Sequence, residues 1–245
     1  MNVRVDLAAP GRVLAIGAHP DDIEFGCGAS LAKWSDGGAV VHLCVCTDGS
    51  KGTWNPDANL ASLAQTREQE QRDAAKILGA VAVHFLRRVD GELANDLSTR
   101  AEVCATIREV RPDVIVGHDP WRPYRLHPDH RAAGLLAVSG IVAARDPHFF
   151  AEQGLKPFRP QTLLLFEPAR VDHVETVGEH LDRKVDALLA HRSQWRSTMA
   201  IDDTDEDAAA GQRAAFVGGL HDDARIAGLR AGVRAGEAFA RLDDL

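Results

Sequence analysis

The chain has 245 residues, of which 45% are hydrophobic and 26% are charged, and this length and composition predict a single well-buried domain over residues 1–245. The formal net charge of −8 argues against a nucleic-acid partner, because nucleic-acid binding depends on clustered lysine and arginine. No apolar run approaches the ~18–20 residues that span a bilayer, so no membrane segment is predicted.

The opening residues do not have the apolar core of a signal peptide, and we therefore expect a cytoplasmic protein. The four cysteines, Cys27, Cys44, Cys46 and Cys104, show neither CxxC spacing nor the density of a disulfide-stabilised secreted protein. Each lies in a predicted helix or strand, which indicates buried and reduced thiols.

The hydrophobic pattern predicts strands and helices that alternate from residue 13 to residue 144. In chain order they are a strand at 13–16, a helix at 23–36, a strand at 39–47, a helix at 60–78, a strand at 81–86, a helix at 98–111, a strand at 113–117 and a helix at 132–144. This alternation predicts an α/β fold, a Rossmann-like three-layer αβα arrangement with a mostly parallel sheet. In such a fold the first and fourth of these strands are neighbours, and ligands bind beyond their carboxyl ends.

After residue 144 the pattern becomes weaker. It predicts strands at 161–166 and 171–177, a helix at 178–193, a solvated acidic loop at 201–210 and a helix at 214–242. The segment from His191 to Gln194 (HRSQ) is expected either to line a pocket or to cap the end of the helix before it.

His19-Pro20-Asp21-Asp22 follows the first predicted strand and opens the first predicted helix. His19 and Asp22 are three residues apart and can converge on one cation, while Asp21 lies beside them without having to bind it. A simpler alternative is that the aspartates only stabilise the helix N-terminus by capping and by charge, which is worth about 0.3–1 kcal/mol. Capping does not explain the histidine.

His127-Pro128-Asp129-His130 repeats this pattern after the fourth predicted strand. Because the two loops leave neighbouring strands at the same edge of the sheet, the motifs together supply three nitrogen or oxygen ligands, an unligated acid and an unligated histidine. Three protein ligands with an open position are typical of catalytic zinc, whereas structural zinc usually has four ligands rich in cysteine. His84 and His118 are instead predicted to be hydrogen-bonded core residues.

Six short motifs occur in one order along the chain. They are AHPDD at 18–22, TDG at 47–49, RxxE from Arg67 to Glu70, Asp90-Gly91, HPDH at 127–130 and HRSQ at 191–194. In this order they resemble the PIG-L/LmbE family of zinc-dependent N-acetylglucosaminyl deacetylases, over residues 12 to about 195. The pair of AHPDD and HPDH carries most of the specificity of the resemblance.

The resemblance implies one mononuclear metal site with His19, Asp22 and His130 as its ligands. Zn²⁺ is the implied cofactor, with another divalent metal such as Fe²⁺ as the alternative. A divalent cation lowers the pKa of water towards about 7 and polarises an amide carbonyl, as amide hydrolysis requires.

The resemblance also implies roles for other residues of the motifs. Asp21 would be the general base, His127 would stabilise the oxyanion or protonate the leaving amine, and Asp129 would orient a histidine. Arg67 and Asp90 match positions that contact sugar hydroxyls in the family, although aspartate before glycine is also ordinary turn chemistry. The implied reaction removes an acetyl group from an N-acetylated amino sugar or a related small conjugate, so the expected partner is a small N-acetyl molecule.

Two positions depart from the family pattern. Many sugar-processing members have a tyrosine two residues before the second motif, whereas this chain has Arg125 there and Tyr124 one position earlier. Which of the two takes the role of that tyrosine stays open. Ile23 follows AHPDD, and the family's glutamate has its counterpart one residue later, at Glu24.

Other functions remain as alternatives. A metal-dependent amidase or hydrolase of a non-sugar substrate would use the same residues. A phosphoesterase would also need a basic phosphate clamp or a second metal, for which only Lys51, Arg67 and Arg125 are candidates. A dinucleotide-binding module would need GxGxxG after the first strand, which the residues at 17–20 exclude. The oligomeric state, including a homo-oligomer, stays open.

Overall fold

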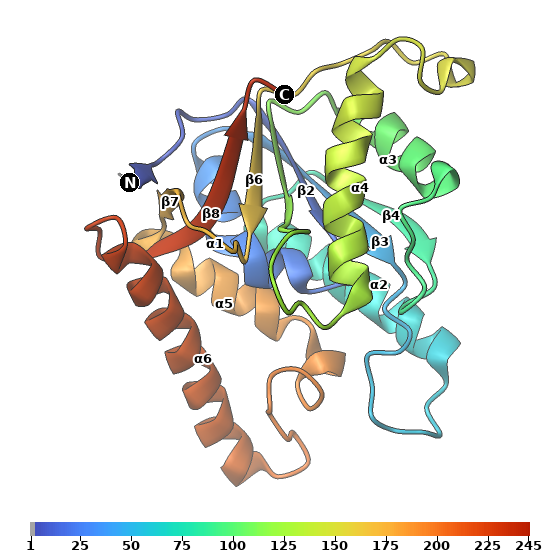
Figure 1. The fold of residues 1–245 in the computed structure, drawn as a ribbon. Coiled ribbons are helices and arrows are strands. Elements are labelled where there is room, and N and C mark those ends of the chain that lie inside the picture. The colour runs from blue at the N-terminus through green and yellow to red at the C-terminus, as the bar shows by residue number, and fades with distance from the viewer. Residues whose placement is uncertain (1–2) are drawn as a thin grey trace.

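The computed structural model describes residues 3–245, in which one mixed β-sheet is packed between two layers of helices (Figure 1). Over these residues the sheet has eight strands in the order β1-β7-β8-β6-β5-β2-β3-β4. The strands are β1 (Arg4–Val5), β2 (Arg12–Gly17), β3 (Val40–Thr47), β4 (Ala82–Arg88), β5 (Val114–His118), β6 (Thr162–Phe166), β7 (His173–Thr176) and β8 (Gly236–Asp243). The helices are α1 (Asp22–Asp36), α2 (Leu60–Leu78), α3 (Leu97–Val110), α4 (Pro128–Arg145), α5 (Leu181–Leu189) and α6 (Glu206–Leu229), with short 3-10 helices η1 (Ala151–Gln153), η2 (Gly178–His180) and η3 (Arg192–Gln194).

The pairings between strands confirm the predicted mostly parallel α/β sheet. β8 runs antiparallel to both of its neighbours, and the other pairs are parallel. β2 lies between β3 and β5, so the first and fourth predicted strands are neighbours as expected. The register pairs Val13 with Val114 and Ile16 with Gly117, which brings the ends of β2 and β5 to the same level. The segments after these two strands therefore begin side by side.

Alternate residues of β2 pack on opposite faces of the sheet. Val13 and Ala15 belong to the hydrophobic cluster formed with α1, α2 and α5. Leu14 and Ile16 belong to the cluster on the other face, formed with α3 and α4. Each is fully buried, and burial of a leucine or isoleucine side chain contributes about 1.5–3 kcal/mol. Packing on both faces thus fixes the carboxyl end of β2, where the first motif begins.

Most predicted elements agree with the structure to within a few residues, and the helix predicted at 60–78 matches α2 at both ends. Asn59 caps α2 by accepting a hydrogen bond from the Ser62 N–H, and Gly79 ends it in the left-handed conformation. The helix predicted at 178–193 is divided into η2, α5 and η3, with a break at His191.

The helix predicted at 214–242 is wrong at both ends. α6 begins earlier, inside the predicted acidic loop, because the Asp205 side chain accepts a hydrogen bond from the Asp207 N–H and caps the helix. The last part of the predicted helix is β8, which lies between β6 and β7. Its alanine and arginine residues favour a helix, but hydrogen bonding to two strands and complete burial of Phe239 outweigh that local preference.

Two further predictions can be compared with the structure. The four cysteines are buried and free, as expected. Over residues 3–245, no helix has both the length and the apolar character needed to cross a membrane. β1 was not predicted, because a strand of two residues is too short to produce a hydrophobic pattern.

Candidate active site

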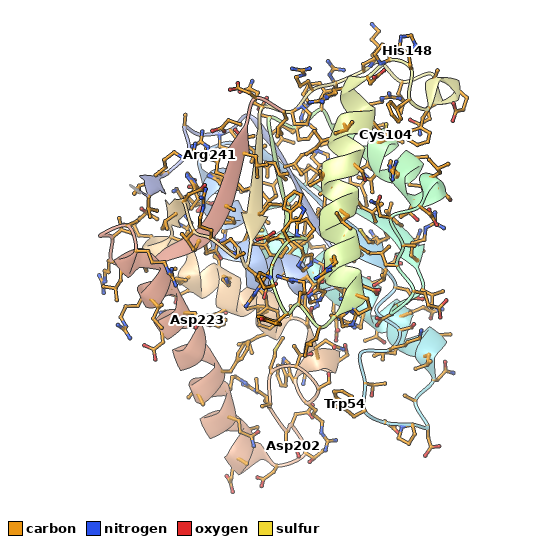
Figure 2. The ribbon with its side chains drawn as sticks, viewed as in Figure 1. Trp54, Cys104, His148, Asp202, Asp223 and Arg241 are labelled. Atoms are coloured by element: carbon orange, nitrogen blue, oxygen red, sulfur yellow. The ribbon has the colours of Figure 1, made fainter. Side chains whose placement is uncertain are left out.

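A cavity of about 750 Å³ opens at the carboxyl ends of β2 and β5. Residues of both motifs line it, namely His19, Asp21, Asp22, His127 and His130. Trp54, between β3 and α2, and Asp223, on α6, line it from other sides (Figure 2). Small-molecule sites are typically about 300–1,000 Å³, so the cavity has the size of a small-molecule site.

The first motif forms the start of α1. Asp21 is the N-cap residue, but its side chain makes no capping hydrogen bond, so the capping alternative does not hold for it. Asp22 closes the turn, because its Oδ2 accepts a hydrogen bond from the His19 N–H at 2.7 Å. Asp21 has a φ of 97°, a strained conformation for a residue other than glycine. Such strain costs about 1–3 kcal/mol and is frequent at functional sites.

His19 lies among three carboxylates. Its Nδ1 is 3.2 Å from Asp22 Oδ2, and its Nε2 is 3.2 Å from both Asp90 Oδ1 and Asp129 Oδ2. Burial lowers the pKa of His19, but hydrogen bonds to Asp129 and Asp22 outweigh burial and raise the pKa to about 12. The surrounding negative charge therefore favours a positive charge at this position, on the ring itself or on a bound metal ion. Two carboxylates hold the ring proton on Nε2, which leaves Nδ1 available to bind a metal.

Asp22 connects His19 to His130. Its Oδ1 is 3.3 Å from His130 Nε2, while its Oδ2 faces His19. The same Oδ2 is 3.2 Å from His118 Nε2. His118 is buried and hydrogen-bonded, as predicted, but its partner is a residue of the site. The signal that could have indicated this was its position at the carboxyl end of the strand beside β2.

Among residues 3–245, three groups of side chains have ligand atoms close enough to share a cation. They are His19 with His127 and His130, Asp22 with His118 and His130, and His19 with Asp90 and Asp129. The predicted set of His19, Asp22 and His130 draws on the first two groups and is joined through the two oxygens of Asp22. Two imidazoles and one carboxylate beside a cavity fit a divalent cation such as zinc. None of the three groups contains all three of these residues, so this ligand set stays a prediction.

Asp21 is buried beside the predicted ligands, and two residues of α2 hold it. Arg67 Nη2 is 3.2 Å from Asp21 Oδ2, and Gln71 Oε1 accepts a hydrogen bond from the Asp21 N–H at 3.0 Å. Burial raises the pKa of Asp21 to about 6, although the charge of Arg67 acts in the opposite direction. A carboxylate whose pKa lies near neutrality is suited to accept and release a proton.

His127 is the N-cap residue of α4, and its Nδ1 accepts a hydrogen bond from the Asp129 N–H at 3.3 Å. This contact leaves the ring proton on Nε2, so a neutral His127 is a hydrogen-bond donor. Burial, followed by the charges of His19 and His130, lowers the pKa of His127. The neutral ring is therefore favoured, and it can still donate to an oxyanion.

The predicted substrate-binding residues line the cavity, but the protein already uses several of their atoms. Arg67 Nη1 donates to the Gly49 carbonyl at 2.8 Å. Asp90 Oδ2 accepts a hydrogen bond from the Lys51 N–H at 3.0 Å. Both residues thus hold the segment between β3 and α2 against the site. Their contact with sugar hydroxyls stays a prediction.

Arg125, and not Tyr124, is directed into the protein. Tyr124 is 96% exposed, whereas the Arg125 side chain is 5% exposed. Arg125 Nη1 donates to Glu167 Oε2 at 2.7 Å and lies 3.1 Å from His130 Nδ1. Arg125 thus contacts a predicted ligand, but whether it takes the role of the family's tyrosine stays open. Glu167, at the end of β6 with a φ of 49°, is a further site residue that sequence reasoning missed.

The chain is similar to several known deacetylases. The family model PIG-L, described as GlcNAc-PI de-N-acetylase, matches residues 14–141. Diacetylchitobiose deacetylase of Thermococcus kodakarensis is 34% identical over 187 residues, which cover 75% of this chain and 70% of the relative. The chain belongs to the PIG-L family.

A second relative compared by sequence and one solved structure agree with this assignment. The chain is 35% identical over 169 residues to the 1D-myo-inositol 2-acetamido-2-deoxy-alpha-D-glucopyranoside deacetylase of Streptomyces avermitilis, over 58% of this chain and 57% of the relative. The structure of N,N'-diacetylchitobiose deacetylase from Pyrococcus horikoshii superposes with a TM-score of 0.84 and 29% identity, over 96% of this chain and 84% of that chain. The predicted family and fold class are thus confirmed. The PIG-L match contains both His-Pro-Asp motifs and ends before HRSQ and α6.

Proposed function

We propose that this protein is a metal-dependent deacetylase that removes the acetyl group from an N-acetylated amino sugar or a related small conjugate. The proposal is carried by the convergence of both His-Pro-Asp motifs on one cavity, with Asp21 beside the predicted metal ligands. The two relatives compared by sequence are deacetylases of acetylated amino sugars by name, which supports it. Zn²⁺ is the proposed cofactor, with Fe²⁺ as the alternative.

His19, Asp22 and His130 would hold the cation through two ring nitrogens and a carboxylate. A divalent cation bound there would supply Lewis acidity towards water and the amide carbonyl. Asp129 would orient His19 by accepting its Nε2–H, since these atoms are 3.2 Å apart. Asp129 is itself held, because its Oδ2 accepts a hydrogen bond from the Gly91 N–H at 2.6 Å.

Asp21 would accept the proton of the attacking water as general base. The water oxygen forms a bond to the acetyl carbon, and the charge that develops on the carbonyl oxygen is stabilised by the Nε2–H of His127. When the carbon–nitrogen bond breaks, the amide nitrogen takes up the proton that Asp21 has just acquired, while the neutral His127 donates only a hydrogen bond. The products are acetate and a free amine.

Replacing His127 with alanine is expected to lower turnover on the order of 10²-fold, because a donor to the oxyanion is lost. Metal content is expected to stay at the parent level, since His127 is not a predicted ligand. Acetate release and elemental analysis of the same zinc-reconstituted sample measure both effects. The control is His148→Ala, at the end of the molecule away from Trp54 (Figure 2). Loss of metal together with activity in His127→Ala would mean that the roles of His127 and His130 are reversed.

Trp54 is expected to contribute to substrate binding. Its side chain lines the cavity and is 87% exposed, so an apolar ring face is available for one face of a sugar ring. Aromatic contacts contribute about 0.5–1.5 kcal/mol, so Trp54→Ala is expected to raise KM for a two-ring acetylated conjugate about 2- to 10-fold while kcat stays unchanged. Trp121→Ala, with a side chain that is 56% exposed on the segment between β5 and α4, is the matched control. Equal effects of the two variants would contradict a specific role for Trp54.

The decisive test of the proposed function is acetate release by the zinc-loaded protein from a panel of small molecules. The panel contains N-acetylated amino sugars, their inositol and nucleotide conjugates, and small thiol-derived amides. Release from the acetylated sugars supports the proposal, whereas release from the non-sugar amides alone supports the alternative of a metal-dependent amidase. No release from any member contradicts both. The cytoplasmic location and the single-domain organisation stay predictions from the sequence.

A further inference from the structure

The HRSQ segment places His191 in the interior of the protein, directly after α5. His191 and Glu24 of α1 are both fully buried, and His191 Nε2 is 3.6 Å from Glu24 Oε2. Within the described residues, Glu24 Oε2 and both ring nitrogens of His191 have no hydrogen-bond partner. Charged side chains are rarely buried unless they are paired, so each of these two residues accounts for the burial of the other.

Gln71 connects this buried pair to Asp21. The Gln71 Nε2 donates to Glu24 Oε1 at 2.6 Å, and Gln71 Oε1 accepts a hydrogen bond from the Asp21 N–H at 3.0 Å. A carboxylate can only accept hydrogen bonds, so Glu24 fixes which way the Gln71 amide faces. That orientation presents an acceptor to the backbone of Asp21, the residue with a φ of 97°.

His191 is the nearest basic side chain to the buried Oε2 of Glu24, at 3.6 Å. Burial lowers the pKa of His191, but the carboxylates of Glu24 and Asp21 outweigh burial, so its pKa lies above the ordinary value. A ring held at this distance from Glu24 Oε2 places a counter-charge beside a side chain that is otherwise buried without one. Without the ring, Glu24 would be buried without a counter-charge, and its hold on Gln71 would weaken.

We propose that His191 is a positioning residue for Asp21, which it holds in its strained backbone conformation through Glu24 and Gln71. Asp21 touches the reacting atoms in the proposed function, so this inference rests on that function for its effect on turnover. It assigns a role to HRSQ, for which the sequence left a pocket-lining role and a capping role open. The end of α5 needs no cap from His191, since the side chain makes no hydrogen bond to it over the described residues.

If His191 only supported the fold, replacing another equally buried histidine would have the same effects on exchange at Asp21 and on turnover. His173 on β7 provides that comparison, because it is fully buried and its Nε2 is 2.7 Å from the fully buried Glu175. β7 is separated from β2 by β8, β6 and β5 in the sheet. His173→Phe therefore removes a buried histidine–glutamate pair on a strand other than the two that carry the His-Pro-Asp motifs.

The test compares His191→Phe with His173→Phe in the full chain. Amide hydrogen exchange of Asp21, followed by NMR, is expected to be about 10-fold faster or more in His191→Phe and unchanged in His173→Phe, because only the former releases the Asp21 N–H. Turnover of His191→Phe is expected to fall between about 10- and 10²-fold with KM unchanged. A shift of a catalytic group by about 1 Å can lower the rate by about 10²-fold. His191→Gln, a smaller change, is examined in the same way in case the phenylalanine variant does not fold.

The two readouts separate the outcomes. Parent-like exchange at Asp21 in a folded His191 variant overturns the proposal, as does an equal loss of turnover in His173→Phe. If the parent protein hydrolyses nothing in the panel, the proposed function is rejected. Amide exchange needs no substrate, so the exchange rates still decide the positioning role of His191.

Discussion

Replacing His19 with alanine is expected to abolish binding of a divalent metal at near-stoichiometric occupancy. His19 Nδ1 is the nitrogen that faces Asp22, while the carboxylates at Nε2 keep the ring oriented. Alanine removes the ligand and leaves Asp90 and Asp129 without the ring nitrogen that both contact. Elemental analysis after zinc reconstitution measures the loss, and activity is expected to disappear with the metal.

Two control variants make this result specific. His42 and His84 form a second histidine pair, with His42 Nδ1 at 3.2 Å from His84 Nε2, so His42→Ala tests whether that pair binds the metal instead. His118→Asn distinguishes the predicted ligand set from the group of Asp22, His118 and His130, and it is expected to retain metal. Loss of metal in His118→Asn with retention in His19→Ala would reject the predicted ligands in favour of that group.

Asp21→Asn is expected to keep the metal and to lose about 10²–10⁴-fold in turnover, the usual contribution of a general base. Asparagine has nearly the same shape, and its amide oxygen can still accept a hydrogen bond from Arg67, but it cannot take a proton from water. The measurement is kcat at saturating substrate, together with metal content.

Asp119→Asn is the matched control for this variant. Asp119 is similarly buried, at 4% exposed against 5% for Asp21, and its Oδ1 and Oδ2 accept hydrogen bonds from the backbone of Trp121 and Ala169. We expect stability to fall in that variant without a large change in kcat. Near-normal turnover in Asp21→Asn, with metal present, would exclude Asp21 as the base.

Much of the candidate site could be predicted from the sequence because its residues occur in two short motifs. Spacing alone places His19 near Asp22 and His127 near His130, and a parallel sheet brings the two loops together. Gln71 could not be predicted in the same way. It is one of several polar residues on α2, and only its contacts with Asp21 and Glu24 distinguish it.

The sequence by itself determined the alternation of strands and helices up to residue 144 and the edge of the sheet at which the two motifs meet. These features depend on hydrophobic period, caps and turn residues, all of which act over a few neighbouring positions. The tertiary structure alone decided that residues 236–243 form a strand, that His118 faces Asp22 and that His191 is buried against Glu24. Each of these depends on pairing or charge compensation between residues far apart in the chain, and such contacts override local preference without leaving a local pattern.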